Sequence, residues 1–583
     1  MIRLIFGLCM CIALAKPEML LAQFNYSTNA DGNSVTVTGY FGPAGYPAVI
    51  PPTFNNLAVI AIGDSAFAND GGVTGITLPD SITSIGSNAF IYCGSLPEIV
   101  IPNGVTNIGE FAFAFCDGLT SITILGSVSS VGQQAFVGCT GVTNVTMTNG
   151  VSSTAPFEFW GCSRLTSIII PGTVTNMGGH EFYQCPLTNV TISDGVAAIG
   201  MATFQGCPLT AVAIPGSVSS IGEYAFNSCV SLTNVALTDG LTSIGQNAFL
   251  DCGSLTGIII PNGVTNIGMQ AFYGCPFTNL TIPGSVASIG DYALNSCTTL
   301  TNVTLAEGIT SIGDYAFGSC SGLTTVTIPG SVFEIGSDAF SSCTALTNVA
   351  ISDGVAGIGT NAFEGCTSLS AITIPPSVTN IADGAFLACA RLAGVTIPGS
   401  VASIGSNAFQ QCSSLSSVTL ESGVATIGSY AFQQCTDLTN ITIPASVTNL
   451  GYYAFFSCTN LTSAYFTGNA PSADSTVFFA DTNVTVYYSP GSTGWSSNFA
   501  GVPAVLWNPM IQASSAAVSA SGAVFGFNVI GAANFTVVVE VNTNLAEPSW
   551  NPIGTVALTN GSSYFTDSLQ TTSSERFYRL RSP

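Results

Sequence analysis

The segment from Ala316 to Gly336, "AFGSCSGLTTVTIPGSVFEIG", contains most of one unit of a sequence motif that the chain repeats along most of its length. Each repeat unit contains one cysteine, and consecutive cysteines are 23 or 22 residues apart. They stand at positions 93, 116, 139, 162, 185, 207, 229, 252, 275, 297, 320, 343, 366, 389, 412, 435 and 458. Asp70 occupies the cysteine position one unit before Cys93, so the repeat unit occurs about eighteen times. A fixed period in the twenties is typical of a solenoid, in which each repeat forms one coil.

The order of residues within the unit predicts the path of a coil. Residues 323–329 alternate apolar with polar side chains and are rich in β-branched types, which predicts a short strand. Pro329 ends this strand because it has no backbone N–H, and the residues after it form a turn. The apolar side chains of 335–340 are then expected to point inward. Since one coil cannot bury its own apolar side, the coils should stack with parallel strands around a shared core.

The consensus "LTNVTIPGSVxxIGxxAFxxC" recurs from about Ile62 to Leu461. In this pattern the sequence resembles the BspA-like leucine-rich repeats of bacterial secreted and surface proteins. The resemblance implies a curved leucine-rich-repeat solenoid with a parallel sheet along one side, and a role in adhesion or protein binding. Members of that family share no catalytic residues, so the resemblance transfers none to this chain.

Both ends of the chain depart from the repeat. Residues 1–22 place Arg3 before an apolar run and small residues, which is the pattern of a secretory signal peptide. Strand-like sequence with Gly and Pro turns precedes the first coil, and further alternating segments follow the last one. The expected regions are a signal peptide (1–22), an N-terminal β cap (23–60), the solenoid (61–461), its C-terminal cap (462–507) and a small antiparallel β-sandwich module (508–583).

Composition restricts the partners. Residues 23–583 hold 29 acidic residues against five arginines, and they contain no lysine. Because nucleic acids and anionic lipid surfaces bind through Lys and Arg, we expect neither as a partner. After residue 22 we find no run of about 20 apolar residues, which a transmembrane helix requires. We therefore expect an exported protein, secreted or on the cell surface, that contacts an extracellular protein or surface glycan; the oligomeric state is not indicated.

The repeated cysteine predicts a ladder of buried thiols. Cysteines at one place in every coil stack about 4.8 Å apart with parallel side chains, and this arrangement suits the S–S dihedral angle poorly. Metal sites use short spacings such as C-x₂-C, which these cysteines lack. We therefore expect no disulfide, no metal and no cofactor, and we interpret cysteine as a small apolar filler.

One threonine per strand is expected to point away from the core. Thr327 lies between the inward residues Val326 and Ile328, and many other coils also place threonine there. Threonine favours half-exposed strands for its own reasons. The alternatives are a recognition face and an ice-matching array, although the latter usually needs two threonines per strand. The candidate residues of this exposed strand face are Thr281, Thr304, Thr327, Thr373, Thr396, Thr419 and Thr442.

The repeat is least regular between residues 154 and 183. Glu158 and Glu181 occupy the position of the repeated alanine in consecutive coils, about 5 Å apart at the backbone. Such a pair could bind a ligand or act in glycoside hydrolysis. Alternatively, a bulged corner could expose this position, and polar residues would then accumulate without a function. The candidate ligand-binding residues are Glu158, Trp160, Arg164, His180, Glu181 and Tyr183, and none is predicted to be catalytic.

Together these observations predict an exported, non-enzymatic binding or adhesion protein that presents an extended face of its solenoid to a protein or a glycan. Two alternatives remain at this point. The protein could be a structural component of the cell envelope without a discrete ligand, or an enzyme that acts on glycans through Glu158 and Glu181.

Overall fold

The computed structural model describes residues 23–126, 128–152, 158–507, 509–518, 524–531, 535–545, 549–558, 562–568 and 576–581. Within these ranges the chain forms strands and turns, and no helix there has the length and hydropathy to span a membrane. The expected signal peptide, residues 1–22, and residues 153–157 of the irregular segment lie outside the described residues. The chain divides into two compact units, Met1–Ile309 and Thr310–Pro583.

The first unit begins with strands that come before the first complete coil. They are β1 (Phe24–Thr28), β2 (Ser34–Tyr40), β3 (Ala48–Val49), β4 (Thr53–Phe54) and β5 (Leu57–Ile62), and β3 pairs in parallel with β6 (Ile76–Thr77) of the first coil. β1 pairs antiparallel with β2, β2 pairs in parallel with β5, and β5 pairs in parallel with β7 (Ser84–Ile85). These strands occupy the backbone groups at the edge of the first coil, which would otherwise be open to pairing with another chain.

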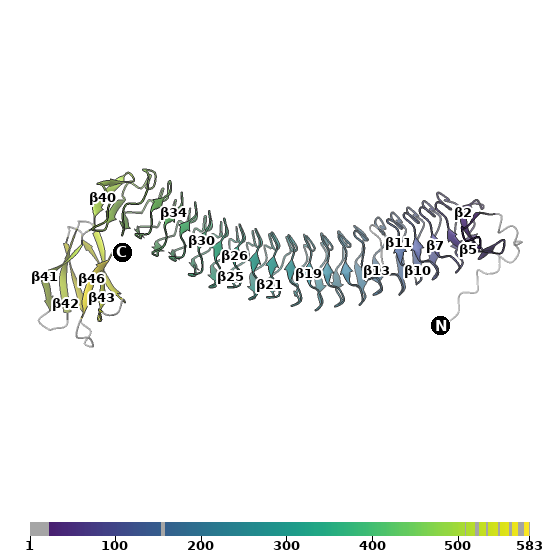
Figure 1. Cartoon of the computed structure of the whole chain (residues 1–583), viewed down its shortest axis with the longest axis horizontal. Helices are drawn as coiled ribbons and strands as arrows, with labels where there is room; N and C mark the ends of the chain where they lie inside the picture. Colours follow the sequence, from purple (N-terminus) through teal and green to yellow (C-terminus); the bar gives the residue numbers. More distant parts are fainter. Residues whose placement is uncertain are drawn as a thin grey trace. The chain divides into compact units, whose positions relative to one another are not determined.

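Most later coils of the first unit contain one long strand, as the repeat predicts. These strands are β8 (Glu98–Ile101), β10 (Ser121–Ile124), β12 (Asn144–Met147), β13 (Ser167–Ile170), β14 (Asn189–Ile192), β16 (Ala211–Ala213), β18 (Asn234–Ala236), β21 (Asn279–Ile282) and β23 (Asn302–Leu305). Within each of the sheets β8–β10–β12, β13–β14–β16–β18 and β21–β23, neighbouring strands pair in parallel. Their residues are in register, so that Ile122 of β10 lies beside Val145 of β12. Figure 1 shows the coils of each unit stacked one on the next.

The sequence predicts one strand per coil, whereas the structure adds a second, two-residue strand on another side of the coil. In the first unit these strands are β7, β9 (Asn107–Ile108), β11 (Ser130–Val131), β15 (Ala198–Ile199), β17 (Ser220–Ile221), β19 (Ser243–Ile244), β20 (Asn266–Ile267) and β22 (Ser288–Ile289). Each buries its second residue, as Ile244 does, and pairs in parallel with the short strand of a neighbouring coil, as β19 does with β20. Two residues are too few to show the alternation by which a strand is recognised in a sequence.

The second unit repeats both kinds of strand. Its long strands are β25 (Thr325–Ile328), β27 (Asn348–Ile351), β29 (Ala371–Thr373), β31 (Gly394–Ile397), β33 (Ser417–Leu420), β35 (Asn440–Ile443), β37 (Ser463–Phe466), β38 (Thr485–Tyr488) and β40 (Val502–Leu506), with β39 (Asn498–Phe499) antiparallel to β40. Its short strands are β24 (Ser311–Ile312), β26 (Glu334–Ile335), β28 (Gly357–Ile358), β30 (Asn380–Ile381), β32 (Ser403–Ile404), β34 (Thr426–Ile427) and β36 (Asn449–Leu450).

Stacked phenylalanine rings fill the core of each unit. From Phe67 to Phe272 in the first unit, consecutive rings lie 4.8–5.5 Å apart between centroids. From Phe317 to Phe478 in the second unit, the spacing is 5.1–5.5 Å. This spacing follows from the distance between stacked strands, with near-parallel rings at typical stacking distances. The repeated phenylalanine is therefore the side chain that joins each coil to the next.

The chain ends in two three-stranded antiparallel sheets. One has the order β41 (Met510–Val518), β42 (Val524–Ile530), β45 (Ser562–Ser568), and the other has the order β44 (Asn551–Leu558), β43 (Phe535–Asn542), β46 (Phe577–Arg581). Phe527 of the first sheet and Val537 of the second belong to one buried cluster, which also includes Tyr465 of β37 and Tyr487 of β38 in the C-terminal cap of the solenoid. The predicted β-sandwich is thereby confirmed, and its core continues into the last coils of the second unit.

Candidate functional site

The seventeen repeated cysteines are free thiols, and all of them are buried. The thiol of a coil contacts the backbone of the preceding coil. For example, Cys343 Sγ donates a hydrogen bond to the carbonyl oxygen of Phe317, at 3.2 Å. That oxygen also accepts the backbone N–H of Cys320, at 3.2 Å. Burial raises the pKa of Cys366 to about 12, so this thiol stays protonated at neutral pH. The cysteine is therefore a small core residue that also supplies a hydrogen-bond donor, and it is not a reactive group.

Glu158 and Glu181 both point into the core. Both side chains have 0% exposure. The backbone hydrogen bond from Phe159 N to Glu181 O, at 3.0 Å, joins the two coils that contain them. Glu181 Oε1 also accepts a hydrogen bond from Gly178 N. The position of the repeated alanine is therefore not exposed in these two coils, in contrast to the alternative that a bulged corner exposes it, because the coil directs the residue inward whatever its type. A ligand on the surface does not reach either carboxyl group.

The other residues of the irregular segment lie at the surface. Trp160 is 43% exposed, Arg164 is exposed, and His180 and Tyr183 are half-buried. The rings of His180 and Tyr183 are 5.8 Å apart between centroids, and burial lowers the pKa of His180. The structure thus separates the six candidate residues into two buried carboxyl groups and four surface side chains.

The outward threonines lie where the alternation of the strand predicts. Six of the seven candidates are exposed: Thr281, Thr304, Thr327, Thr373, Thr396 and Thr419; Thr442 is half-buried. They are in register across neighbouring strands, as Thr281 with Thr304 and Thr396 with Thr419. Some coils put an apolar residue at this position, and Ile259 there is 82% exposed. Each unit therefore presents a row of hydroxyl groups at the spacing of parallel strands, about 4.8 Å.

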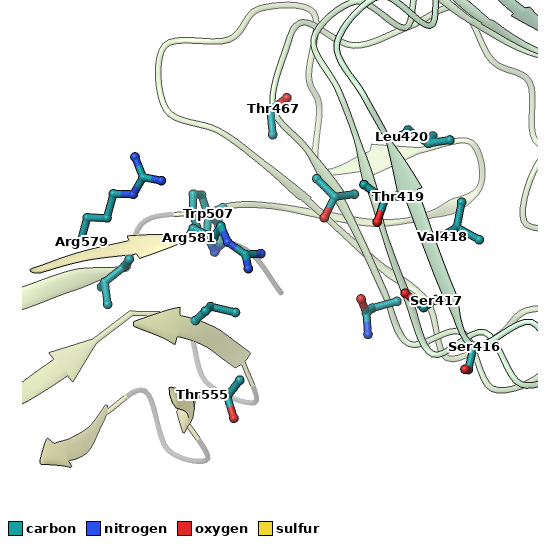
Figure 2. Close-up of a pocket in the computed structure, with 14 residues that line it drawn as sticks. Ser416, Ser417, Val418, Thr419, Leu420, Thr467, Trp507, Thr555, Arg579 and Arg581 are labelled. Carbon is teal, nitrogen blue, oxygen red and sulfur yellow. The ribbon is translucent and has the colours of Figure 1, made fainter. Parts of the chain in front are cut away.

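At one end of this row, Thr419 and Thr442 line a cavity of about 760 Å³ (Figure 2). The solenoid side is made of Ser416, Ser417, Val418, Thr419, Leu420, Asn440, Thr442 and Thr467. The module side is made of Trp507, Val538, Thr555, Arg579, Leu580 and Arg581. No repeat or motif spacing in the sequence predicts that these two segments meet. One signal was present: three of the five arginines after residue 22 lie in "RFYRLRSP" at the end of the chain.

The two arginines of the cavity share one carboxyl group. Arg579 Nε lies 2.6 Å from Glu540 Oε2, and Arg581 Nε lies 2.7 Å from Glu540 Oε1. Glu540 is almost fully buried, and burial raises its pKa, but the hydrogen bonds and charges of Arg581 and Arg579 outweigh that effect and hold the pKa below its usual value. Arg579 also lies over the ring of Trp550, 4.5 Å from the centroid. Both guanidinium groups are thus held in place by neighbours within the module.

Comparison with known proteins identifies the family of the chain. The model of the "BspA type Leucine rich repeat region (6 copies)" matches residues 60–186, 152–276, 265–393 and 379–494, which together make up most of the chain. The chain belongs to this family. The expectation drawn from the repeated consensus is thereby confirmed, and the coil of the BspA-type repeat is the one described above.

Several solved structures are similar to this BspA-type chain. A leucine-rich repeat protein from Bacteroides ovatus has 24% identity and a TM-score of 0.43, with 80% of this chain and 98% of that chain covered. A leucine-rich cell surface protein from Faecalibacterium prausnitzii has 25% identity and a TM-score of 0.29, with 77% and 94% covered. The pneumococcal vaccine antigen PcpA has 15% identity and a TM-score of 0.29, with 80% and 92% covered. No curated protein gives a significant match.

Proposed function

We propose that this BspA-type protein is an extracellular, non-enzymatic binding protein that presents the outward side of its long strands to a protein or glycan partner. The observation that carries the proposal is the row of exposed outward threonines, in register from strand to strand within each unit. Its family supports a place outside the cell, and so does the signal-peptide pattern of residues 1–22.

The physical basis of the proposal is preorganisation. A hydroxyl group both donates and accepts hydrogen bonds, so a row of them can pair with polar groups of either kind. Threonine is stiff at χ1 and sits on paired strands, so little conformational entropy is lost when a partner binds. The row thus offers regularly spaced contacts on a rigid surface, which suits an extended partner.

The catalytic alternative receives no support from the irregular segment. Hydrolysis through Glu158 and Glu181 would require both carboxyl groups to reach a substrate, and both are fully buried. Trp160 remains a separate candidate for a binding contact because it is partly exposed.

The test is an array of extracellular matrix proteins and glycans, probed with the mature chain and with two matched double variants. Thr281→Glu with Thr304→Glu changes the exposed strand row, while Thr242→Glu with Thr265→Glu changes exposed threonines on another side of neighbouring coils. We expect the first variant to weaken binding of the partner about tenfold or more, because it adds charge and removes two contacts. The second variant should bind as the unchanged protein does.

Thermal melting of each variant distinguishes a loss of binding from a loss of folding. Equal loss in both double variants would contradict a site on the strand row, and so would the absence of any bound partner. Loss of binding on Trp160→Ala with full binding by Thr281→Glu/Thr304→Glu would instead assign the site to the irregular segment.

A further inference from the structure

The cavity at the C-terminal module differs in charge from the rest of the chain. Among the residues that the structure describes, the charged ones that line it are Arg579 and Arg581, although the whole chain carries a formal net charge of −23. The carboxyl group of Glu540, which both arginines contact, balances only one of the two positive charges. At physiological ionic strength, charges more than about 8 Å away are largely screened. A bound group therefore meets a local positive charge, and this favours an anion.

The arginines are held ready for such a group. Their Nε atoms bind Glu540, and the side chains of Arg579 and Arg581 are still 48% and 45% exposed. These bonds hold both arginine side chains in place, and the ring of Trp550 also holds Arg579. The side chains therefore lose little conformational entropy when a ligand binds. A guanidinium group is planar and matches the two oxygens of a carboxylate, which is the geometry of strong charge-assisted hydrogen bonds.

The opposite side of the cavity has a different chemistry. It carries the hydroxyl groups of Ser417 and Thr419, which can donate and accept hydrogen bonds. The hydroxyl of Ser416 already donates to Ala393 O at 3.2 Å, and Asn440 Nδ2 donates to Thr439 Oγ1 at 3.1 Å, so the oxygens of these two side chains add acceptors. Figure 2 shows Ser416, Ser417 and Thr419 on the solenoid side, with Trp507, Arg579 and Arg581 on the module side. A sugar ring presents hydroxyl groups along its edge and apolar C–H groups on its faces. Polar side chains beside an indole ring match both features.

We propose that this cavity is a binding site for a short acidic saccharide, in which a uronic acid carboxylate meets Arg579 and Arg581 and the sugar hydroxyls meet the serine and threonine side chains of β33. A short chain or a terminal acidic sugar fits best, because a long polyanion would extend over the acidic solenoid. The proposal goes beyond the extended-face function and does not depend on it, since the cavity requires only one end of the threonine row.

The test measures binding of trigalacturonate to the mature full chain by isothermal titration calorimetry. Its trimethyl ester, with the same hydroxyl groups and no carboxylate charge, is the matched control ligand. We expect trigalacturonate to bind and the ester to bind about tenfold or more weakly, because the ester loses the charge-assisted contacts.

The repeat supplies a matched pair of protein variants. Thr419 and Thr327 occupy the same exposed position of their coils, but only Thr419 lines the cavity. Thr419→Glu should weaken trigalacturonate binding about tenfold or more, because it brings a negative charge into the cavity, whereas Thr327→Glu should leave binding unchanged. Both variants keep Glu540, Arg579 and Arg581, and thermal melting of each variant checks that the module stays folded.

Three results would overturn the proposal. They are the absence of trigalacturonate binding, equal binding of the acid and the ester, and equal weakening by Thr419→Glu and Thr327→Glu. A hexaglutamate peptide serves as a further probe: if it binds with the same dependence on Thr419 while trigalacturonate does not, the site takes an acidic peptide and the saccharide is wrong. If the saccharide proposal fails, the proposed binding function of the threonine row is not affected, because the array experiment tests that function with variants at Thr281 and Thr304.

Discussion

Single residues at the ends of the thiol ladder show how the repeat ends. Asp70 stands one unit before Cys93, and Asp481 stands 23 residues after Cys458, so an aspartate takes the cysteine position at both ends. The two environments differ. Asp70 is half-buried and accepts a hydrogen bond from Gly72 N at 3.0 Å, whereas Asp481 is only 3% exposed. Burial raises the pKa of Asp481 to about 7. The last coil of the ladder therefore contains a carboxyl group that titrates near neutral pH.

This carboxyl group makes stability depend on pH. In the unfolded chain Asp481 titrates near its ordinary value of 3.8, so between about pH 4 and pH 7 the folded state binds the extra proton. The contribution of Asp481 to the free energy of unfolding therefore falls as the pH rises through this window, by about 4 kcal/mol in all. We expect Asp481→Asn to be more stable than the unchanged protein at pH 8, because the amide stays neutral, and to show little gain at pH 4.

Denaturant unfolding at pH 4, 6 and 8 measures this difference, and comparison with the unchanged protein removes the contribution of the other acidic groups. Asp437→Asn is the matched control, because Asp437 is exposed. A stability gain for Asp481→Asn that is the same at all three pH values would show that the carboxyl group does not titrate in this window.

At the scale of elements, the phenylalanine ladder joins the coils. Phe363 is fully buried between Phe340 and Phe386, with ring centroids 5.4 and 5.5 Å away. Leu294 occupies the same position in the first unit and is also fully buried, so the coil accepts another large apolar side chain there. The ladder thus requires volume at this position more than it requires an aromatic ring.

Substitution at Phe363 separates volume from aromaticity. We expect Phe363→Ala to lower the free energy of unfolding by about 3–5 kcal/mol, because it removes buried surface and leaves a cavity between two coils. Phe363→Leu should cost about 1.5 kcal/mol or less if the neighbouring rings close around it, as similar-sized apolar exchanges do. Chemical denaturation of both variants gives these values. Equal costs for alanine and leucine would mean that ring stacking, rather than filled volume, stabilises the ladder.

The same elements show what the sequence could and could not predict. The long strands and the inward direction of Val326 and Ile328 were predictable, because cysteine spacing sets the period and alternation sets the side. For Glu158 the two signals disagreed: its place in the repeat, that of the inward alanine, indicated burial, whereas its charge favoured exposure, and the structure follows the repeat. The cavity was beyond prediction: Thr419 and Arg581 are far apart in sequence, and no periodic pattern connects the solenoid with the module.

At the scale of the whole molecule, stacking makes each coil interact mainly with its two neighbours. A coil is therefore an interchangeable unit as long as its inward residues keep their order. The chain itself contains evidence of this tolerance, since three of its repeats are one residue shorter and each places a proline after the cysteine, as in "CPLT" at Cys185. In this coil Cys185 remains buried and Cys185 Sγ still donates to Phe159 O at 3.1 Å.

Removing whole and partial coils tests this independence. Deleting residues 343–365 joins Ser342 to Cys366 and restores the repeat, so we expect a folded protein with an unchanged circular dichroism spectrum per residue and a melting temperature within a few degrees of the parent. Deleting only 343–354 joins the coils out of phase, so that polar residues take inward positions and the core loses its continuity. This second variant should melt at a much lower temperature or fail to fold. If both deletions melted alike, the coils would not be stabilised by the register of their inward residues.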